Sequence, residues 1–138
     1  MKIAEQKKLP FLFVDGPPGT GCPVIASVTG ASLVLVVTEP SVSGEHDLKR
    51  VITLARHFSI PTVVCVNKWD INLQMTERIE EKARREGARV AGRIRYDPDV
   101  TKSQMEGRVV VETDAPSAKD IRLIWNQISK WEGLNAIE

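Results

Sequence analysis

The sequence contains short runs that are apolar at every position and that alternate with segments of helical periodicity. Phe11–Val14, Ser32–Thr38 and Thr62–Val66 are predicted strands of this kind, and Ala88–Ile94 is a weaker fourth one. Strands that are apolar on both faces are typical of parallel sheets covered by helices on both sides. Strands that alternate with helices favour right-handed β-α-β units. We therefore expect an α/β fold with three layers and a parallel sheet in the middle, as a single domain over residues 1–138.

The segments between these runs predict the helices. Leu48, Val51, Ile52, Ala55 and Phe58 recur at helical spacing and form one apolar face. Serine caps helix starts because its hydroxyl accepts from a free backbone N–H. Helices are expected over Val24–Val28, after an N-cap at Ser43, over Thr76–Glu86, through Met105 and, after an N-cap at Ser117, over Ala118–Trp131. A further extended piece is expected at Val109–Val111.

The composition excludes several classes of protein. The chain has 42% hydrophobic and 27% charged residues, as an ordinary globular domain does. Its 19 basic and 18 acidic residues create no overall field that would attract nucleic acid or an anionic membrane. The two cysteines form no C-x-x-C pair, which favours a reducing, cytoplasmic setting and argues against an iron–sulfur site within this chain. No run is long enough to span a membrane.

Asp15 follows the first apolar run directly, and a Pro/Gly-rich turn, Gly16–Gly21, comes next. In doubly wound folds, ligands bind at the carboxyl ends of the strands. One carboxylate at such a place can hold Mg²⁺ through water, because this ion keeps most of its own waters. The alternative is a buried strand and a tight turn in which Asp15 is only a cap.

The same turn resembles a phosphate-binding P-loop, but two residues argue against that interpretation. Cys22 and Pro23 stand where the motif G-x-x-x-x-G-K-[ST] needs a lysine and a hydroxyl. Cysteine carries no positive charge at neutral pH, and proline lacks both the hydroxyl and a backbone N–H. We therefore do not expect a P-loop here.

A second pattern, Asn67-Lys68-Trp69-Asp70, follows the third predicted strand. An amide side chain offers a donor and an acceptor to a purine edge, and a lysine stem can lie over the ring. Asp70 could accept from the N–H groups of guanine. Ser117-Ala118-Lys119 resembles a second guanine-contacting motif, but it lies well past the fourth strand, so a helix N-cap is the favoured interpretation.

Together the stretches DGPPG, VTEP-x-x-SG-x-HDL and VNK-x-D resemble the MinD/ParA/Mrp group of deviant P-loop ATPases, and most closely the MinD-superfamily ATPases with an inserted ferredoxin domain. The resemblance runs from Phe11 to about Trp125. It implies a Walker B-type aspartate at Asp15, which is catalytic and holds Mg²⁺ through water. It also implies nucleotide-binding roles for the following residues: Gly16, Pro17 and Gly19 in switch II, Asn67, Lys68 and Asp70 at the base, and Tyr96 and Asp97 beside it. Arg95 departs from the family, which usually has proline there.

Family members begin with a strand and a glycine-rich loop with two lysines, and this branch adds a cysteine-rich insert; this sequence contains neither. We therefore expect the C-terminal part of a P-loop ATPase domain that lacks its P-loop strand and does not hydrolyse ATP alone. ATP and Mg²⁺ would be cofactors of the full-length protein, with any iron–sulfur cluster upstream. The alternatives are a GTPase-like module and a non-catalytic interaction domain with the same fold. The resemblance is compatible with a nucleotide, a homodimer and a redox or iron–sulfur protein as partners.

The resemblance also predicts the sheet. Leu33–Val37, Thr62–Val66 and Arg89–Ile94 should lie side by side in that order, because β-α-β links join them. In the family the P-loop strand lies between Phe11–Val14 and Leu33–Val37. We expect Phe11–Val14 to close this gap by pairing with Leu33–Val37; the alternative is an open apolar edge that recruits another chain.

Overall fold

The computed structural model describes residues 11–17 and 21–131 of the chain, and its centre is a parallel sheet. The strands are β1 (Val34–Thr38), β2 (Thr62–Asn67) and β3 (Arg89–Ile94), in the order β1-β2-β3. Val36 lies opposite Val64 in the first pair, and the second pair has an irregularity between Val64 and Cys65. The parallel order predicted for these three strands is confirmed.

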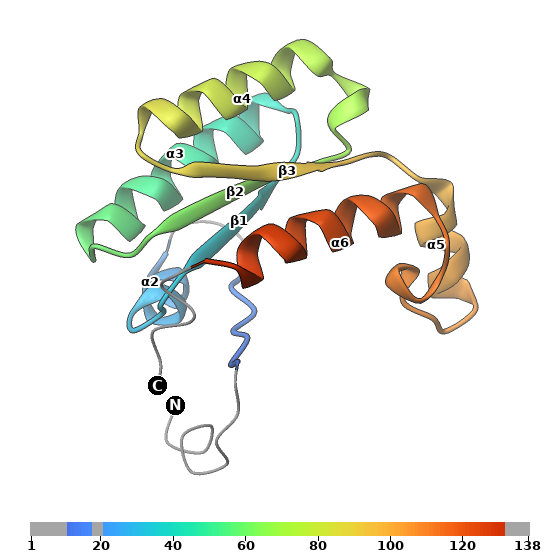
Figure 1. The fold of residues 1–138 in the computed structure, drawn as a ribbon. Coiled ribbons are helices and arrows are strands. Elements are labelled where there is room, and N and C mark those ends of the chain that lie inside the picture. Colours follow the sequence, from blue (N-terminus) through green and yellow to red (C-terminus); the bar gives the residue numbers. More distant parts are fainter. Residues whose placement is uncertain (1–10, 18–20, 132–138) are drawn as a thin grey trace.

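Helices cover both faces of the sheet, so the three-layer α/β prediction is confirmed (Figure 1). The helices are α2 (Cys22–Val28), α3 (Val42–His57), α4 (Leu73–Arg85), α5 (Pro98–Met105) and α6 (Pro116–Ser129), and the 3₁₀ turns are η1 (Trp69–Ile71) and η2 (Val110–Glu112). One face of the sheet packs against α3 and α4, with Leu48, Ile52 and Ile79 in that core. The opposite face packs against α6, through Ile124 and Ile128. None of the helices among the described residues is long and apolar enough to cross a membrane.

Gly92 sets how closely α6 approaches the sheet. Its φ is +150°, a conformation that glycine adopts without strain. A Cβ at this position would lie 2.9 Å from Cγ1 of Ile124. A side chain here would therefore push α6 away from β3.

Several helix starts differ from the prediction, because a neighbouring residue provides the cap. α3 begins one residue after Ser41, whose hydroxyl accepts from the N–H of Gly44 at 3.0 Å, so the predicted cap at Ser43 is wrong. α4 begins before Thr76, because the side chain of Asn72 caps it by accepting from Met75. The piece predicted as extended at Val109–Val111 instead overlaps the 3₁₀ turn η2, Val110–Glu112, so this prediction is wrong.

The N-cap predicted at Ser117 is also wrong. α6 begins at Pro116, and its N-cap, Ala115, makes no side-chain capping bond. Ser117 lies in the first turn and is fully buried. Its backbone N–H donates 3.0 Å to Asp97, so a residue from another loop caps this helix.

The Phe11–Val14 run is not a strand, and the prediction that it pairs with Leu33–Val37 is wrong for the single chain. The run is irregular, and its side chains are 38% to 76% exposed. The rings of Phe11 and Phe13 lie 5.6 Å and 5.9 Å from the ring of Trp125 on α6. These aromatic contacts take the place of strand pairing, and β1 remains the edge of the described sheet.

Two buried carboxylates join the helices and the sheet. Glu45 on α3 bonds to Arg78 and Lys82 on α4, and Glu80 on α4 bonds to Arg93 on β3. Burial raises the pKa of Glu45, but hydrogen bonds from Lys82 and Arg78 outweigh this effect, so the pKa is lowered overall. A carboxylate buried among apolar side chains is costly unless it is paired in this way.

Candidate functional site

The polar residues predicted to contact a nucleotide base lie at one edge of the sheet, where the parallel strands end. Asn67 closes β2, and Lys68 and Asp70 come shortly after it; Glu39, which was not predicted at the site, follows β1 at the same edge. Tyr96 follows β3. This edge is the place where open α/β sheets bind their ligands.

Lys68 pairs with Glu39, the residue that follows β1. The φ of Lys68 is +54°, in the left-handed region, so the chain turns sharply as it leaves β2. The Lys68 ammonium donates to Glu39 Oε1 at 2.7 Å. This hydrogen bond raises the pKa of Lys68, so the side chain is positively charged at neutral pH. The pair joins the loops that follow β1 and β2.

Asp70 joins the loops that follow β2 and β3. Its Oδ1 accepts a 2.7 Å hydrogen bond from the backbone N–H of Tyr96. The Tyr96 side chain is largely exposed. One carboxylate oxygen of Asp70 therefore has a structural partner, and Oδ2 makes no hydrogen bond to another described residue.

Asp97 has a structural role that the sequence did not predict. Its Oδ1 accepts from the N–H of Asp99 at 3.0 Å, and its Oδ2 accepts from the N–H of Ser117 at 3.0 Å. The backbone hydrogen bond from Ser117, followed by that from Asp99, lowers the pKa of Asp97. Asp97 thus caps α5 and fixes the start of α6, and it brings Ser117 to the end of β3.

Arg95, which departs from the family pattern, has a partner that sequence analysis missed. Its Nε and Nη2 donate to the two carboxylate oxygens of Asp120 at 2.7 Å and 2.8 Å. Its backbone N–H also donates to Asp120 Oδ2 at 3.1 Å. These hydrogen bonds lower the pKa of Asp120. The two-point geometry suits an arginine–carboxylate pair and anchors the end of β3 to α6. No local signal in the sequence joins residues 25 positions apart.

Asn67, like Asp70 Oδ2, has hydrogen-bonding capacity that no described residue uses. Its side chain is half-buried and makes no hydrogen bond to another described residue. Beside it, Trp69 packs against the core, with the Arg93 guanidinium 5.4 Å from its ring centre. The edge thus offers an amide, a fixed lysine stem and an exposed tyrosine ring. This set suits a planar ligand with polar edges.

The residues predicted at the phosphate end are not brought into a site. Asp15, Gly16 and Pro17 are exposed in an irregular segment, so Asp15 does not follow a strand. Gly19 lies outside the described residues. Within residues 11–17 and 21–131, no group of three or more His, Cys, Asp or Glu side chains could hold a metal ion. The described residues therefore contain no metal centre built from several such side chains, and the role of Asp15 toward Mg²⁺ stays a prediction.

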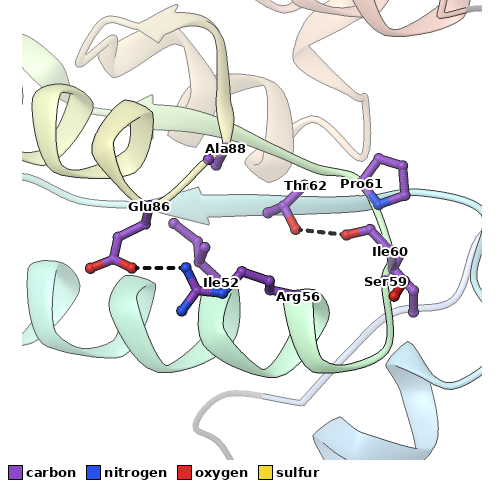
Figure 2. Close-up of a pocket in the computed structure, with 9 residues that line it drawn as sticks. Ile52, Arg56, Ser59, Ile60, Pro61, Thr62, Glu86 and Ala88 are labelled. Atoms are coloured by element: carbon purple, nitrogen blue, oxygen red, sulfur yellow. Dashed lines mark hydrogen bonds and ion pairs between the residues drawn. The ribbon is translucent and has the colours of Figure 1, made fainter.

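Two hollows on the described surface contain none of the predicted residues. One, of about 370 Å³, lies at the amino ends of β2 and β3. Figure 2 shows Arg56 of α3 reaching across it to Glu86, at 3.5 Å. The other, of about 860 Å³, is an open basic surface on α3 and α4 that includes Lys49 and Arg50. The candidate site lies apart from both hollows, at an edge of the sheet where Asp70 and Tyr96 are exposed.

Comparison of the sequence with known proteins finds local similarity. No family model matches the chain. It is 35% identical over 69 residues to the uncharacterized protein MJ0578 of Methanocaldococcus jannaschii, a match that covers 50% of the chain and 25% of that protein. It is 34% identical over 71 residues to MJ0579 of the same organism, which covers 51% and 26%. The chain thus matches about a quarter of the length of these relatives.

Comparison with solved structures identifies the fold. The chain superposes on the MinD cell division protein of Aquifex aeolicus with a TM-score of 0.77 and 24% identity, over 93% of this chain and 56% of that one. The MinC:MinD complex of the same organism gives a TM-score of 0.76 and 24% identity, over 93% and 55%. The parallel sheet with helices on both faces is therefore the P-loop NTPase-like fold of MinD.

Proposed function

We propose that this chain is the base-recognition and switch II portion of a MinD/ParA-like, ATP-binding ATPase, and that it does not hydrolyse ATP alone. The observation that carries the proposal is the position of Asn67 in a MinD-type fold: it ends β2 beside the Lys68–Glu39 pair, and its amide makes no hydrogen bond to another described residue. Tyr96 and Asp70 stand in the adjoining loops. The similarity in fold to MinD supports this proposal. The role of each residue is what we propose.

Each residue has a separate task at the base. The Asn67 amide donates to and accepts from the purine edge, which requires both kinds of group. The Lys68 stem lies over one ring face, and its bond to Glu39 holds that stem in place. The exposed Tyr96 ring provides a second surface for stacking, and stacking on an aromatic ring contributes about 1–3 kcal/mol per base.

The phosphate end is incomplete in this chain. In the proposal Asp15, with Gly16, Pro17 and Gly19, acts at the phosphates and Mg²⁺ once a P-loop is present. Phosphoryl transfer depends on cations and N–H groups around the γ-phosphate, and the sequence contains no P-loop lysine. We expect ATP to bind with a Kd of about 1 mM or weaker, because the charge-assisted phosphate contacts are missing.

The proposal is tested by titrating the ¹⁵N-labelled chain with ATP and following backbone amide shifts. We expect saturable shifts for the loops that follow β2 and β3. Asn67→Ala should abolish them, whereas Asn126→Ala, a change at an exposed position of α6, should leave them unchanged. Shifts that are absent in the unmodified chain, or equal in both variants, would contradict base recognition at this edge.

Hydrolysis is tested separately by phosphate release. We expect no turnover above the buffer blank in the 138-residue chain. Asp15→Asn should therefore change nothing. Turnover that this substitution abolished would show that the chain has a complete catalytic centre.

A second candidate function is guanine recognition, and one contact favours it. Asp97 binds the backbone N–H of Ser117 near the end of β3. The neighbouring residue Tyr96 is bonded to Asp70, so the segment Ser117-Ala118-Lys119 begins near the loop that follows β2. Oδ2 of Asp70 has no hydrogen bond to another described residue and could accept from guanine. GTP that produced the same shifts at a tenfold lower concentration than ATP would establish this alternative.

Protein partners form the last part of the proposal. The MinC:MinD neighbour is a complex between two proteins, which supports a protein partner for this fold as well. The resemblance in sequence is compatible with a redox or iron–sulfur protein as that partner. A chain that bound a partner but no nucleotide would instead be an interaction domain.

A further inference from the structure

We propose that Arg93 and Glu80 are positioning residues for the candidate base site, and that they act through the indole ring of Trp69. Trp69 lies in the loop Asn67–Asp70, which carries side chains proposed to contact the base. None of the three positioning groups touches the base itself. The inference rests on the proposed function, and it names what holds that site in shape.

Trp69 is anchored where the chain leaves β2. Its carbonyl oxygen accepts a 2.9 Å hydrogen bond from the hydroxyl of Thr76, a fully buried residue on α4. Its half-buried ring packs against the core that the sheet forms with α3 and α4. Lys68 and Asp70 are its direct neighbours in the chain. Fixing both the backbone and the ring of Trp69 therefore restricts the residues on either side of it.

Arg93 reaches this ring from β3. The central carbon of its guanidinium lies over the Trp69 ring, 5.4 Å from the ring centre. A guanidinium within about 6 Å of a ring centre is attracted to the ring, and more strongly where water is excluded. The register of the sheet places Arg93 opposite Val66, the residue before Asn67. The contact therefore lies at the point where the loop begins.

Glu80 on α4 fixes the plane of this guanidinium. Its Oε1 accepts from Arg93 Nε at 2.6 Å, and its Oε2 accepts from Arg93 Nη2 at 2.9 Å, which is a two-point pair. The Glu80 side chain is 7% exposed and the Arg93 side chain 31%. A buried ion pair adds little stability compared with apolar side chains of the same volume. It does, however, hold the guanidinium in one orientation over the ring.

The contact with the Trp69 ring differs from the two other attachments of the loop. The Lys68 ammonium binds Glu39, and the Asp70 carboxylate binds the N–H of Tyr96. Both attachments use side chains that are themselves proposed to meet the base, so a ligand competes with them. The Trp69 ring has no such role, so its contacts persist when a ligand binds. They can keep the loop in place in both states.

The first test needs no ligand and follows amide hydrogen exchange in the 138-residue chain by NMR. Arg93→Lys keeps the positive charge but loses the planar two-point pair. The Ile71 N–H donates to Lys68 O at 3.1 Å, so its exchange reports opening of the loop. We expect this amide to exchange at least about tenfold faster in the variant. The amide of Val64, which is fully buried in β2, should keep its rate, because the change is local.

Arg84→Lys is the matched control. Arg84 reaches the same Glu80 oxygen at 3.5 Å and is 60% exposed, and it should not affect the exchange of Ile71. Trp69→Leu removes the ring, and in this background Arg93→Lys should have no further effect. Circular dichroism checks that each variant is folded. An unchanged rate in Arg93→Lys, an equal change in the control, or an equal effect with and without the ring would overturn the proposal.

The second test measures whether the position of the loop matters for the base. ATP is titrated into the ¹⁵N-labelled Arg93→Lys chain, under conditions where urea curves show that the variant is fully folded. We expect a Kd at least about fivefold weaker than that of the unmodified chain. Lost stability alone does not change this Kd, because both proteins are folded. An unmodified chain without ATP-dependent shifts would overturn the proposed function, whereas an equal Kd in both chains would overturn the positioning role alone.

Discussion

The carboxylate of Asp70 accepts a 2.7 Å hydrogen bond from the backbone N–H of Tyr96, 26 residues further along the chain. The bond joins the loops that leave β2 and β3. It sets the distance between the two sides of the candidate base site. In the proposed function, Asp70 therefore orders the site before any ligand is present, and only its second oxygen is available to a base.

Removal of this carboxylate should loosen the loops. We expect Asp70→Ala to lower the free energy of unfolding by about 0.5–1.5 kcal/mol, the range for one exposed hydrogen bond. Urea denaturation measures this change. Asp114→Ala is the control, because Asp114 is exposed and makes no hydrogen bond to another described residue. Equal effects of the two substitutions would show that the Asp70–Tyr96 bond contributes nothing.

Acid should weaken the attachment of α5 and α6 to the end of β3. Hydrogen bonds from the Ser117 and Asp99 backbones lower the pKa of Asp97 below 3.8 in the folded chain. The stabilisation is therefore complete above about pH 4 and is lost as the pH falls through the folded-state pKa. Asp97→Ala should cost about 1 kcal/mol at pH 7, as the loss of a helix cap does. Its unfolding free energy should fall less steeply between pH 4 and pH 2 than that of the unmodified chain, and parallel curves would contradict this role.

Gly44 should not tolerate a side chain. A Cβ there would lie 2.4 Å from the carbonyl oxygen of Glu39 and 2.7 Å from Oγ1 of Thr38. Alanine normally stabilises a helix interior by about 1 kcal/mol relative to glycine. Here we expect Gly44→Ala to destabilise the fold by about 1–3 kcal/mol, because α3 must move away from β1. Thermal and urea unfolding give the sign directly, and a stabilised variant would refute the close approach.

The two cysteines should differ in reactivity. Burial raises the pKa of the Cys65 thiol to about 12, and Cys22 is exposed. Because the thiolate is the reactive form, Cys65 should be inert at neutral pH in the folded chain. A thiol reagent such as DTNB should titrate one group per native chain and both after unfolding in urea. Cys22→Ser should remove the native reaction, and two reactive groups in the native chain would contradict the buried position of Cys65.

The sequence alone predicted the elements whose character is local. Thr62–Val66 is apolar at every position, and it forms the central strand β2 with helices on both sides. The loop Asn67–Asp70 was placed at the end of this strand because the apolar run stops there. The parallel order β1-β2-β3 followed from the alternation of strands and helices. Periodicity reports which faces of a segment are apolar, and these features depend on little else.

The tertiary structure decided everything that depends on which neighbour is present. Phe11–Val14 has the composition of a strand, yet its aromatic rings contact Trp125 and leave β1 as an edge. Ser117 is of a residue type that often caps helices, but here its own N–H is bound by the carboxylate of Asp97, from another loop. Apolar side chains and free N–H groups can be satisfied by many partners. The sequence shows that an apolar side chain must be buried or an N–H group bonded. Which residue contacts it depends on how the chain packs.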